Sequence, residues 1–85
     1  MKLTKEEVYD RITSERNYQD SLPHHWTEQD ESHSIADWLT FMEYRINKAK
    51  EAIYYLKPED ALKEVRVITA LGVACMQFRG AKERL

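Results

Sequence analysis

The 85-residue chain has few of the residues that build sharp turns and covalent links: two glycines, two prolines and one cysteine. With only Gly72 and Gly80 available, a glycine-rich loop that cradles phosphates with backbone amides is excluded. The single Cys75 cannot form a disulfide within the chain, and it lies in an apolar stretch. We therefore expect a buried, reduced thiol there rather than a nucleophile.

Long hydrophobic runs and an excess of positive charge are also absent. The longest apolar run falls short of the roughly 18 residues of a membrane-spanning helix, and the first residues are polar. We expect no membrane partner and a cytoplasmic location. The formal net charge of -2 argues against a binder of long nucleic acids, which needs a basic surface. It leaves room for a small nucleotide in a local basic pocket.

The composition is that of a globular protein, 42% apolar and 33% charged, and the chain is long enough for one domain. Residues 60–78 are apolar nearly all round, as in a helix that is enclosed on several sides. A chain this short offers little to enclose it. We therefore predict a homo-oligomer, a dimer or a higher even number, in which a second copy completes a helical bundle.

Capping residues and hydrophobic spacing predict a single all-α domain over residues 1–85. Thr4 and Glu7 form a capping box, Ser34 is a good N-cap, and Pro58 suits a first helical position. The expected architecture is a short N-terminal helix followed by an antiparallel helical hairpin that assembles into an oligomeric bundle. The predicted boundaries are helix 5–18, loop 19–33, helix 34–56 and helix 58–79.

Apolar side chains predict which helix faces pack. The first helix has only a thin apolar face, whereas the second carries an a/d heptad stripe, which is typical of antiparallel or coiled packing. The third carries two seams and so implies two helical partners, one of them in a neighbouring copy. The thin face is Val8, Tyr9 and Ile12; the stripe is Ile35, Leu39, Met42, Ile46, Ala49, Ile53 and Leu56; the seams are Leu62, Val65, Thr69, Gly72 and Met76, and Ile68, Leu71, Cys75 and Phe78.

The end of the first helix carries side chains suited to a nucleotide. Arg16 can bind a phosphate bidentately, Tyr18 can stack on a base, and Asn17 can read a base edge. The alternative is a frayed helix end with a packed Tyr18 and a surface pair between Arg16 and an acid. Arg45 and Lys48, one turn apart on the second helix, add a basic strip; the alternative for them is a solvated helix face.

The long loop holds three histidines among acidic residues, which raises the question of a metal site. It contains no pair of histidines four residues apart on a helix and no zinc-ligand spacing, so a solvated loop is favoured. We predict no metal and no cofactor. Loops of this length are often functional, and His25 and Trp26 join the candidate ligand-binding residues.

Four segments together carry a family resemblance: Glu15-Arg16-x-x-Gln19-Asp20, the histidine and tryptophan loop, the helix that opens with Trp38-Leu39, and Leu62-Lys63-Glu64 leading into an Ala/Val-rich helix. Across nearly its whole length the chain resembles the small MazG-like proteins common in bacteriophage genomes. The resemblance implies an all-α nucleoside triphosphate pyrophosphohydrolase fold and oligomers built through helical bundles. Enzymes of that family hold Mg²⁺ with E-E-x-x-E on one helix and E-x-x-D on the next.

This chain departs from that family at the metal ligands. Residues 43–47 or 44–48 occupy the E-E-x-x-E position and keep at most one of its three carboxylates, and Val67 replaces the aspartate that should follow Glu64. Mg²⁺ needs several oxygen ligands. Arg45 and Lys48 could instead supply positive charge there, which favours holding a phosphate-containing ligand without cleaving it.

We therefore predict a non-catalytic, oligomeric nucleotide-binding protein of phage type, one role for which is sequestering a host-defence nucleotide second messenger in the host cytoplasm. Two alternatives stay open. One is a divergent Mg-dependent nucleoside triphosphate pyrophosphohydrolase that uses Glu43, Glu64 and a loop acid. The other is a structural helical module that binds a host protein. The predicted ligand-binding residues are Arg16, Asn17, Tyr18, His25, Trp26, Arg45 and Lys48.

Overall fold

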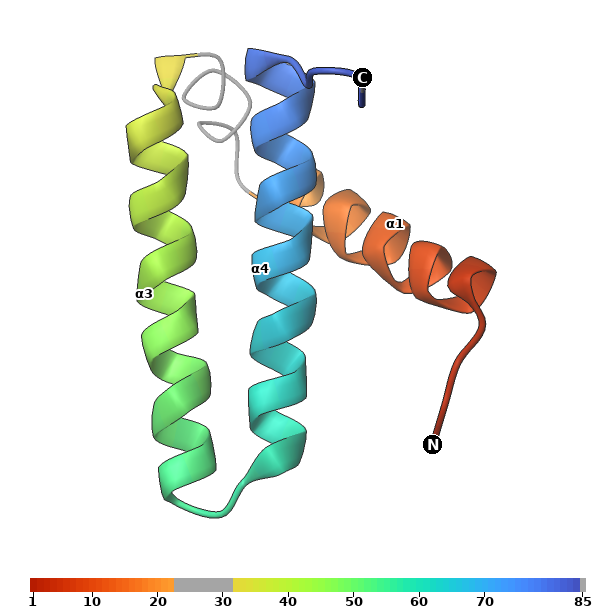
Figure 1. Cartoon of the computed structure of the whole chain (residues 1–85), viewed down its shortest axis with the longest axis vertical. Helices are drawn as coiled ribbons and strands as arrows, with labels where there is room; N and C mark the ends of the chain where they lie inside the picture. Colours follow the sequence, from red (N-terminus) through yellow and green to blue (C-terminus); the bar gives the residue numbers. More distant parts are fainter. Residues whose placement is uncertain (23–31, 85) are drawn as a thin grey trace.

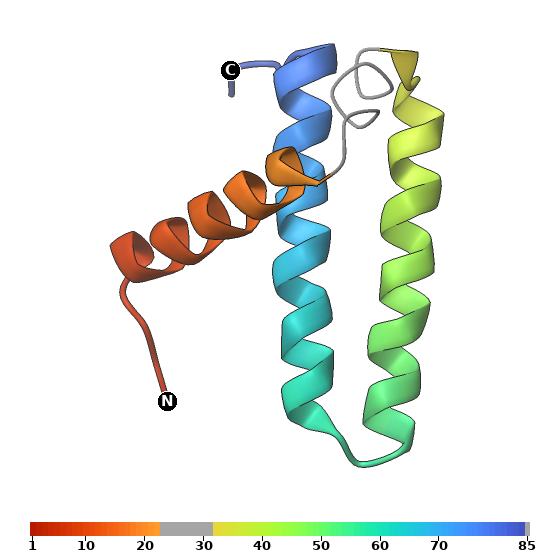
Figure 2. The same ribbon diagram turned by 180° about the vertical axis from the view of Figure 1, so that it is seen from behind.

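The computed structural model describes residues 1–22 and 32–84, and the predicted all-α class is confirmed over this part of the chain, which contains no strand. Its helices are α1 (Lys5–Ser21), α3 (Ile35–Tyr54) and α4 (Pro58–Arg79) (Figure 1). α3 and α4 run antiparallel as a hairpin. α1 crosses α4 on one side of that hairpin, as Figure 2 shows from behind. None of the helices described is long and apolar enough to cross a membrane.

The helix ends follow local chemistry. α1 continues to Ser21, past the predicted end at residue 18, because the Arg16 side chain bonds to Gln19 and Asp20 in the last turn. Its C-cap residue, Leu22, is extended (φ -66°, ψ 155°), as the residue before a proline prefers. α3 ends at Tyr54, two residues short of the prediction, and Leu56 in the turn has a φ of 60°.

Two reciprocal capping boxes start the first two of these helices. The Thr4 hydroxyl accepts from the Glu7 amide at 3.2 Å, and the Glu7 carboxylate accepts from the Thr4 amide at 3.0 Å. Ser34 and Asp37 repeat the arrangement at 3.1 and 2.9 Å. These bonds hold the pKa of the Glu7 and Asp37 carboxyls below their usual values, mainly through the backbone amides of Thr4 and Ser34.

Trp38 is the centre of the hairpin core. It is 1% exposed, and its ring stacks on Phe78 with centroids 6.3 Å apart and meets Phe41 edge to face at 5.8 Å. Leu71 and Ala74 of α4 are buried with it. The hairpin is therefore closed by the predicted seam that contains Leu71 and Phe78.

The a/d stripe of α3 points mostly away from α4. Leu39 and Ile53 are each 57% exposed, and Ile35 is 56% exposed. The other predicted seam of α4 is exposed too, with Leu62 at 62% and Val65 at 50%. Both sets thus share an open side of the hairpin.

The prediction that the thin apolar face docks α1 is largely wrong. Val8 and Tyr9 are exposed, and only Ile12 of that face is half-buried. The buried residues of α1 are Glu15 and Arg16, which are 8% and 7% exposed. Because α1 crosses α4 near its own C-terminal end, its first turns extend into solvent and polar contacts do the docking (Figures 1 and 2).

We expect acid to weaken both capping boxes. A carboxyl whose pKa is lower in the folded than in the unfolded chain contributes stability that is complete above the unfolded pKa and is lost as the pH falls through the folded pKa. NMR titration should therefore give Glu7 and Asp37 midpoints below 4.5 and 3.8. Thr4→Ala should raise the Glu7 midpoint and leave that of Asp37 in place. A Glu7 midpoint at or above 4.5 in the intact chain would contradict the assignment.

We expect Trp38→Ala to lower the free energy of unfolding by about 3–5 kcal/mol, because it empties the largest buried site of the core. Urea denaturation followed by far-UV circular dichroism measures this. The control is Tyr54→Ala, at a ring that is 79% exposed, which should change stability by about 0.5 kcal/mol or less. If both variants lost the same free energy of unfolding, Trp38 would not be the centre of the core.

Candidate functional site

A concave pocket of about 700 Å³ lies between the C-terminal part of α1 and the hairpin. Its volume falls in the range of small-molecule sites, and its walls are mainly apolar and aromatic with a few polar groups, as such sites usually are. Two predicted ligand-binding residues, Tyr18 and Arg45, line it. The lining residues are Glu15, Tyr18, Gln19, Leu22, His33, Thr40, Phe41, Tyr44, Arg45, Val67 and Leu71.

Helical spacing explains why α3 offers both rings and charge to this pocket. Phe41 and Tyr44 are three residues apart and Arg45 follows Phe41 by four, so all three lie on one side of the helix. The Tyr44 ring centroid is 5.8 Å from Arg45 Cζ and 5.3 Å from Lys48 Nζ. Both cations thus lie over one aromatic ring. His33 packs edge to face on Phe41, with centroids 4.9 Å apart.

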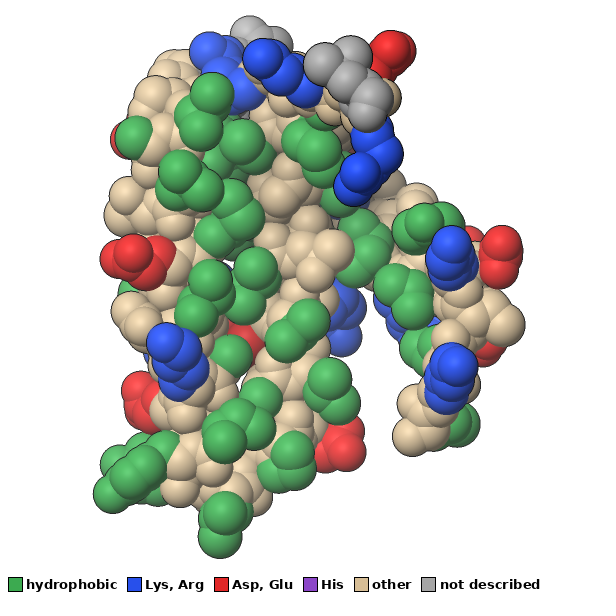
Figure 3. Space-filling model, viewed as in Figure 1, with side chains coloured by type: hydrophobic (Ala, Val, Ile, Leu, Met, Phe, Trp, Pro, Cys, Tyr) green, Lys and Arg blue, Asp and Glu red, His purple; other side chains and the backbone are tan. Residues whose placement is uncertain are grey.

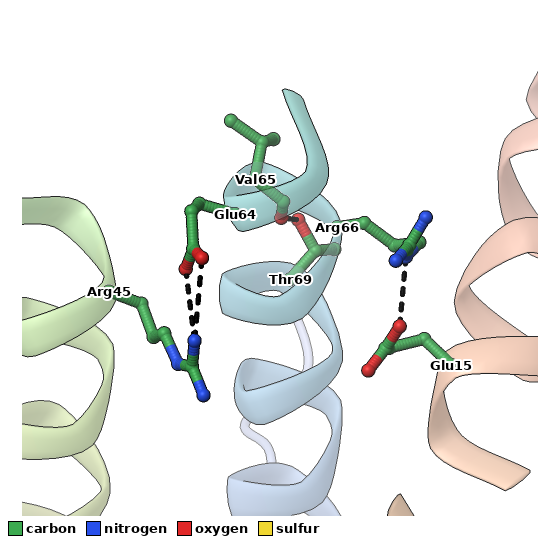
Figure 4. Close-up of polar contacts among 6 residues, drawn as sticks. All are labelled: Glu15, Arg45, Glu64, Val65, Arg66 and Thr69. Atoms are coloured by element: carbon green, nitrogen blue, oxygen red, sulfur yellow. Dashed lines mark hydrogen bonds and ion pairs between the residues drawn. The ribbon is translucent and has the colours of Figure 1, made fainter. Parts of the chain in front are cut away.

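Arg45 is also paired across the hairpin with Glu64. Its Nη1 donates to the two carboxylate oxygens at 3.3 and 3.4 Å (Figure 4). These bonds are longer than the usual charge-assisted hydrogen bond, and the Arg45 side chain is 40% exposed. The resemblance would place metal ligands at these positions of α3 and α4. The side chains found there are a guanidinium beside one carboxylate, with the apolar Val67 in the pocket wall.

On its other side, α4 holds α1 through polar contacts. Arg66 Nε donates to the buried Glu15 carboxylate at 2.8 Å, and Figure 4 shows Glu64 and Arg66 pointing from α4 toward opposite neighbours. Arg16 uses three nitrogens: Nε to Gln77 at 2.9 Å, Nη1 to Gln19 at 2.9 Å and Nη2 to Asp20 at 3.0 Å. These contacts position α1 and therefore one wall of the pocket.

The structure does not gather all the predicted ligand-binding residues. Arg16 and Asn17 line a separate hollow of about 390 Å³ with Val73 and Gln77, and Lys48 lines another of about 340 Å³ near the hairpin turn. His25 and Trp26 lie outside the described residues. Arg16 is buried, and each of its three guanidinium nitrogens donates one hydrogen bond, so its geometry is that of a structural residue.

Other lining residues were not anticipated from the sequence. Phe41 and Tyr44 lie on the same helix as Arg45, and their spacing from Arg45 could have shown that the three residues share a face. Glu15 and Thr40 gave no such signal, because their place in the pocket depends on how α1 crosses α4. Within residues 1–22 and 32–84, no group of three or more His, Cys, Asp or Glu side chains is placed to hold a metal ion.

Comparisons of the chain with protein-family models, curated proteins and solved structures found no match. The resemblance to MazG-like proteins therefore stands on the sequence segments quoted above.

We expect Arg66→Met to destabilise the protein by about 1–3 kcal/mol, since it leaves the buried Glu15 carboxylate without its partner. Urea denaturation of Arg66→Met, Glu15→Gln and the double variant measures the coupling, and the double variant should cost less than the sum of the single variants. Lys63→Met is the matched control on α4, because Lys63 forms only an exposed pair with Asp60 at 3.9 Å. Additive single effects would contradict a docking role for this pair.

Proposed function

We propose that the protein is a non-catalytic, oligomeric binder of a nucleotide-type small ligand, and that the pocket between α1, α3 and α4 is its binding site. The observation that carries the proposal is the combination of aromatic rings and one accessible guanidinium in a pocket of about 700 Å³. Tyr18 offers a face on which a base can stack, whereas the Tyr44 ring is contacted by Arg45 and Lys48. Arg45 offers paired donors for a phosphate.

The weak contacts and the partial exposure of Arg45 support a role in binding anions. Its two contacts with Glu64, at 3.3 and 3.4 Å, leave the other guanidinium donors available, and the side chain is partly open to solvent. An incoming phosphate could share this guanidinium or displace the carboxylate from it. Since Glu64 is 20% exposed, the pair is accessible enough to rearrange without exposing the hydrophobic core.

The same residues favour binding over cleavage. Hydrolysis of a nucleoside triphosphate in the resembled family depends on carboxylates that hold Mg²⁺ against the phosphates, and the ion neutralises charge as it develops. In this chain those positions carry Arg45, Lys48 and Val67. A fixed positive side chain can hold a phosphate but does not activate a water for attack.

The biological role that we propose is sequestration. A small helical protein that binds a nucleotide without consuming it lowers the free concentration of that nucleotide. Taken with the resemblance to phage MazG-like proteins, this suggests capture of a host-defence nucleotide second messenger in the host cytoplasm.

Isothermal titration calorimetry with the full chain tests ligand binding. The panel comprises nucleoside triphosphates and their deoxy forms, cyclic mono-, di- and oligonucleotides, and ADP-ribose. We expect saturable binding of at least one, and Arg45→Ala should weaken it by about 10-fold or more, the loss of a hydrogen bond to a charged group. Tyr18→Ala should weaken it by a similar factor through lost stacking. Lys63→Ala, which removes an exposed charge outside the pocket, is the control and should bind as the wild type does.

Three results would contradict this proposal. The first is the absence of binding across the panel. The second is binding that Arg45→Ala and Lys63→Ala reduce equally. The third is Mg²⁺-dependent release of pyrophosphate from a deoxynucleoside triphosphate mixture, which would identify a divergent pyrophosphohydrolase instead.

A further inference from the structure

One side of the hairpin is an open apolar surface, which we call the hairpin face and define as Ile35, Leu39, Ile46, Ile53, Leu62, Val65 and Met76. Each of these side chains is between 41% and 62% exposed. Figure 3 shows hydrophobic side chains gathered along α3 and α4 on the side seen in Figure 1. α1 crosses α4 on the opposite side, as Figure 2 shows.

Met42, Gly72 and Thr69 belong to the same sequence stripes as the residues of the hairpin face. Half-buried Met42 and Gly72 meet between the two helices, and a Cβ added at Gly72 would lie 3.9 Å from Met42 Sδ, an ordinary contact. Thr69 donates its hydroxyl to the Val65 carbonyl at 2.7 Å (Figure 4). Covering this face would therefore leave no hydrogen bond of Thr69 unmade.

The size of the hairpin face matches what a stable interface needs. A helix of 20 residues such as α3 is about 30 Å long, and two packed helices give a width of roughly 20 Å. That is on the order of 600 Å² in projection, which corresponds to the lower end of the range for specific interfaces, roughly 1,200 Å² in total over both partners. Contiguous exposed apolar patches of several hundred Å² are often functional surfaces.

We propose that a second copy of this chain covers the hairpin face, and that α3 lies antiparallel against the partner's α3 in a twofold four-helix bundle. The a/d spacing of the α3 stripe requires a helical partner of similar length, and a second hairpin presents one with the same spacing. The outer edge of the stripe carries Glu43 and, seven residues later, Lys50. Antiparallel pairing places Glu43 beside the partner's Lys50 twice, once on each side of the twofold axis.

This inference does not rest on the nucleotide-binding proposal. The pocket lies on the side of the hairpin where α1 crosses, so assembly and ligand binding occupy different surfaces. A failure of ligand binding leaves the dimer standing, and a monomeric chain would remove only the oligomeric part of the proposed function. Each has its own measurement.

Sedimentation of the full chain measures assembly. We expect a particle of twice the 10.1 kDa chain mass. Ile46→Glu puts a charge at the centre of the hairpin face and should weaken dimerisation by about 100-fold or more, because two carboxylates would be buried without partners. Val8→Glu is the matched control: Val8 is 40% exposed on α1 and Ile46 is 41% exposed, so both variants replace a similarly exposed β-branched side chain by a carboxylate. Val8→Glu should remain dimeric.

Reversing the charges of Glu43 and Lys50 tests the antiparallel pairing of α3 without altering the apolar contact. Glu43→Lys and Lys50→Glu should each weaken the dimer by about 10-fold, since each places two like-charged pairs at the interface. The double variant should restore wild-type assembly. Retained helicity by circular dichroism shows that the variants fold.

Three outcomes would overturn the proposal. A wild-type chain that sediments as a monomer would leave the face to a lipid surface or to another protein. A dimer that survives Ile46→Glu would have its interface elsewhere. Charge reversals that the double variant fails to rescue would rule out antiparallel pairing of α3.

Discussion

The pocket exists because α1 is held across α4, and charged side chains hold it there. Glu15 and Arg16 are neighbours in sequence, and both are buried, yet they reach different partners on α4: Arg66 for one and Gln77 for the other. With these contacts in place, Tyr18 and Gln19 form one wall of the pocket and Phe41, Tyr44 and Arg45 form another. Removing the polar docking would remove one wall without touching the hairpin.

α4 therefore contacts two neighbours and leaves a third side open. Its seam with Leu71 and Phe78 packs on Trp38, its Arg66 side holds α1, and its Leu62 and Val65 side is exposed. Packing on α3 and α1 explains part of the apolar circumference of this helix in the sequence, and the open apolar side is the one that the proposed dimer covers. The ion pairs of Glu64 and Arg66 show how it still places charge, by directing it sideways toward α3 and α1 (Figure 4).

Much of the fold was predictable because local chemistry determines it. The capping boxes at Thr4 and Ser34 and the proline at position 58 start the helices where the sequence places them. The way in which helices distant in the sequence pack on one another was harder to predict. The sequence marks Arg16 as a possible phosphate ligand, but its burial depends on the angle at which α1 meets α4, which no local pattern encodes. Arg45 and Tyr18 were identified as candidates, whereas Glu15 and Thr40 reach the pocket only through that crossing.

The way α1 is attached has a thermodynamic consequence. Because its buried contacts are mainly charged and its apolar residues Val8 and Tyr9 are already exposed, α1 can detach from α4 while exposing little new apolar surface. Such an opening carries a small heat-capacity change. Separating the hairpin around Trp38 exposes aromatic surface and carries a larger one. The molecule thus has two kinds of opening, which differ in their heat-capacity change.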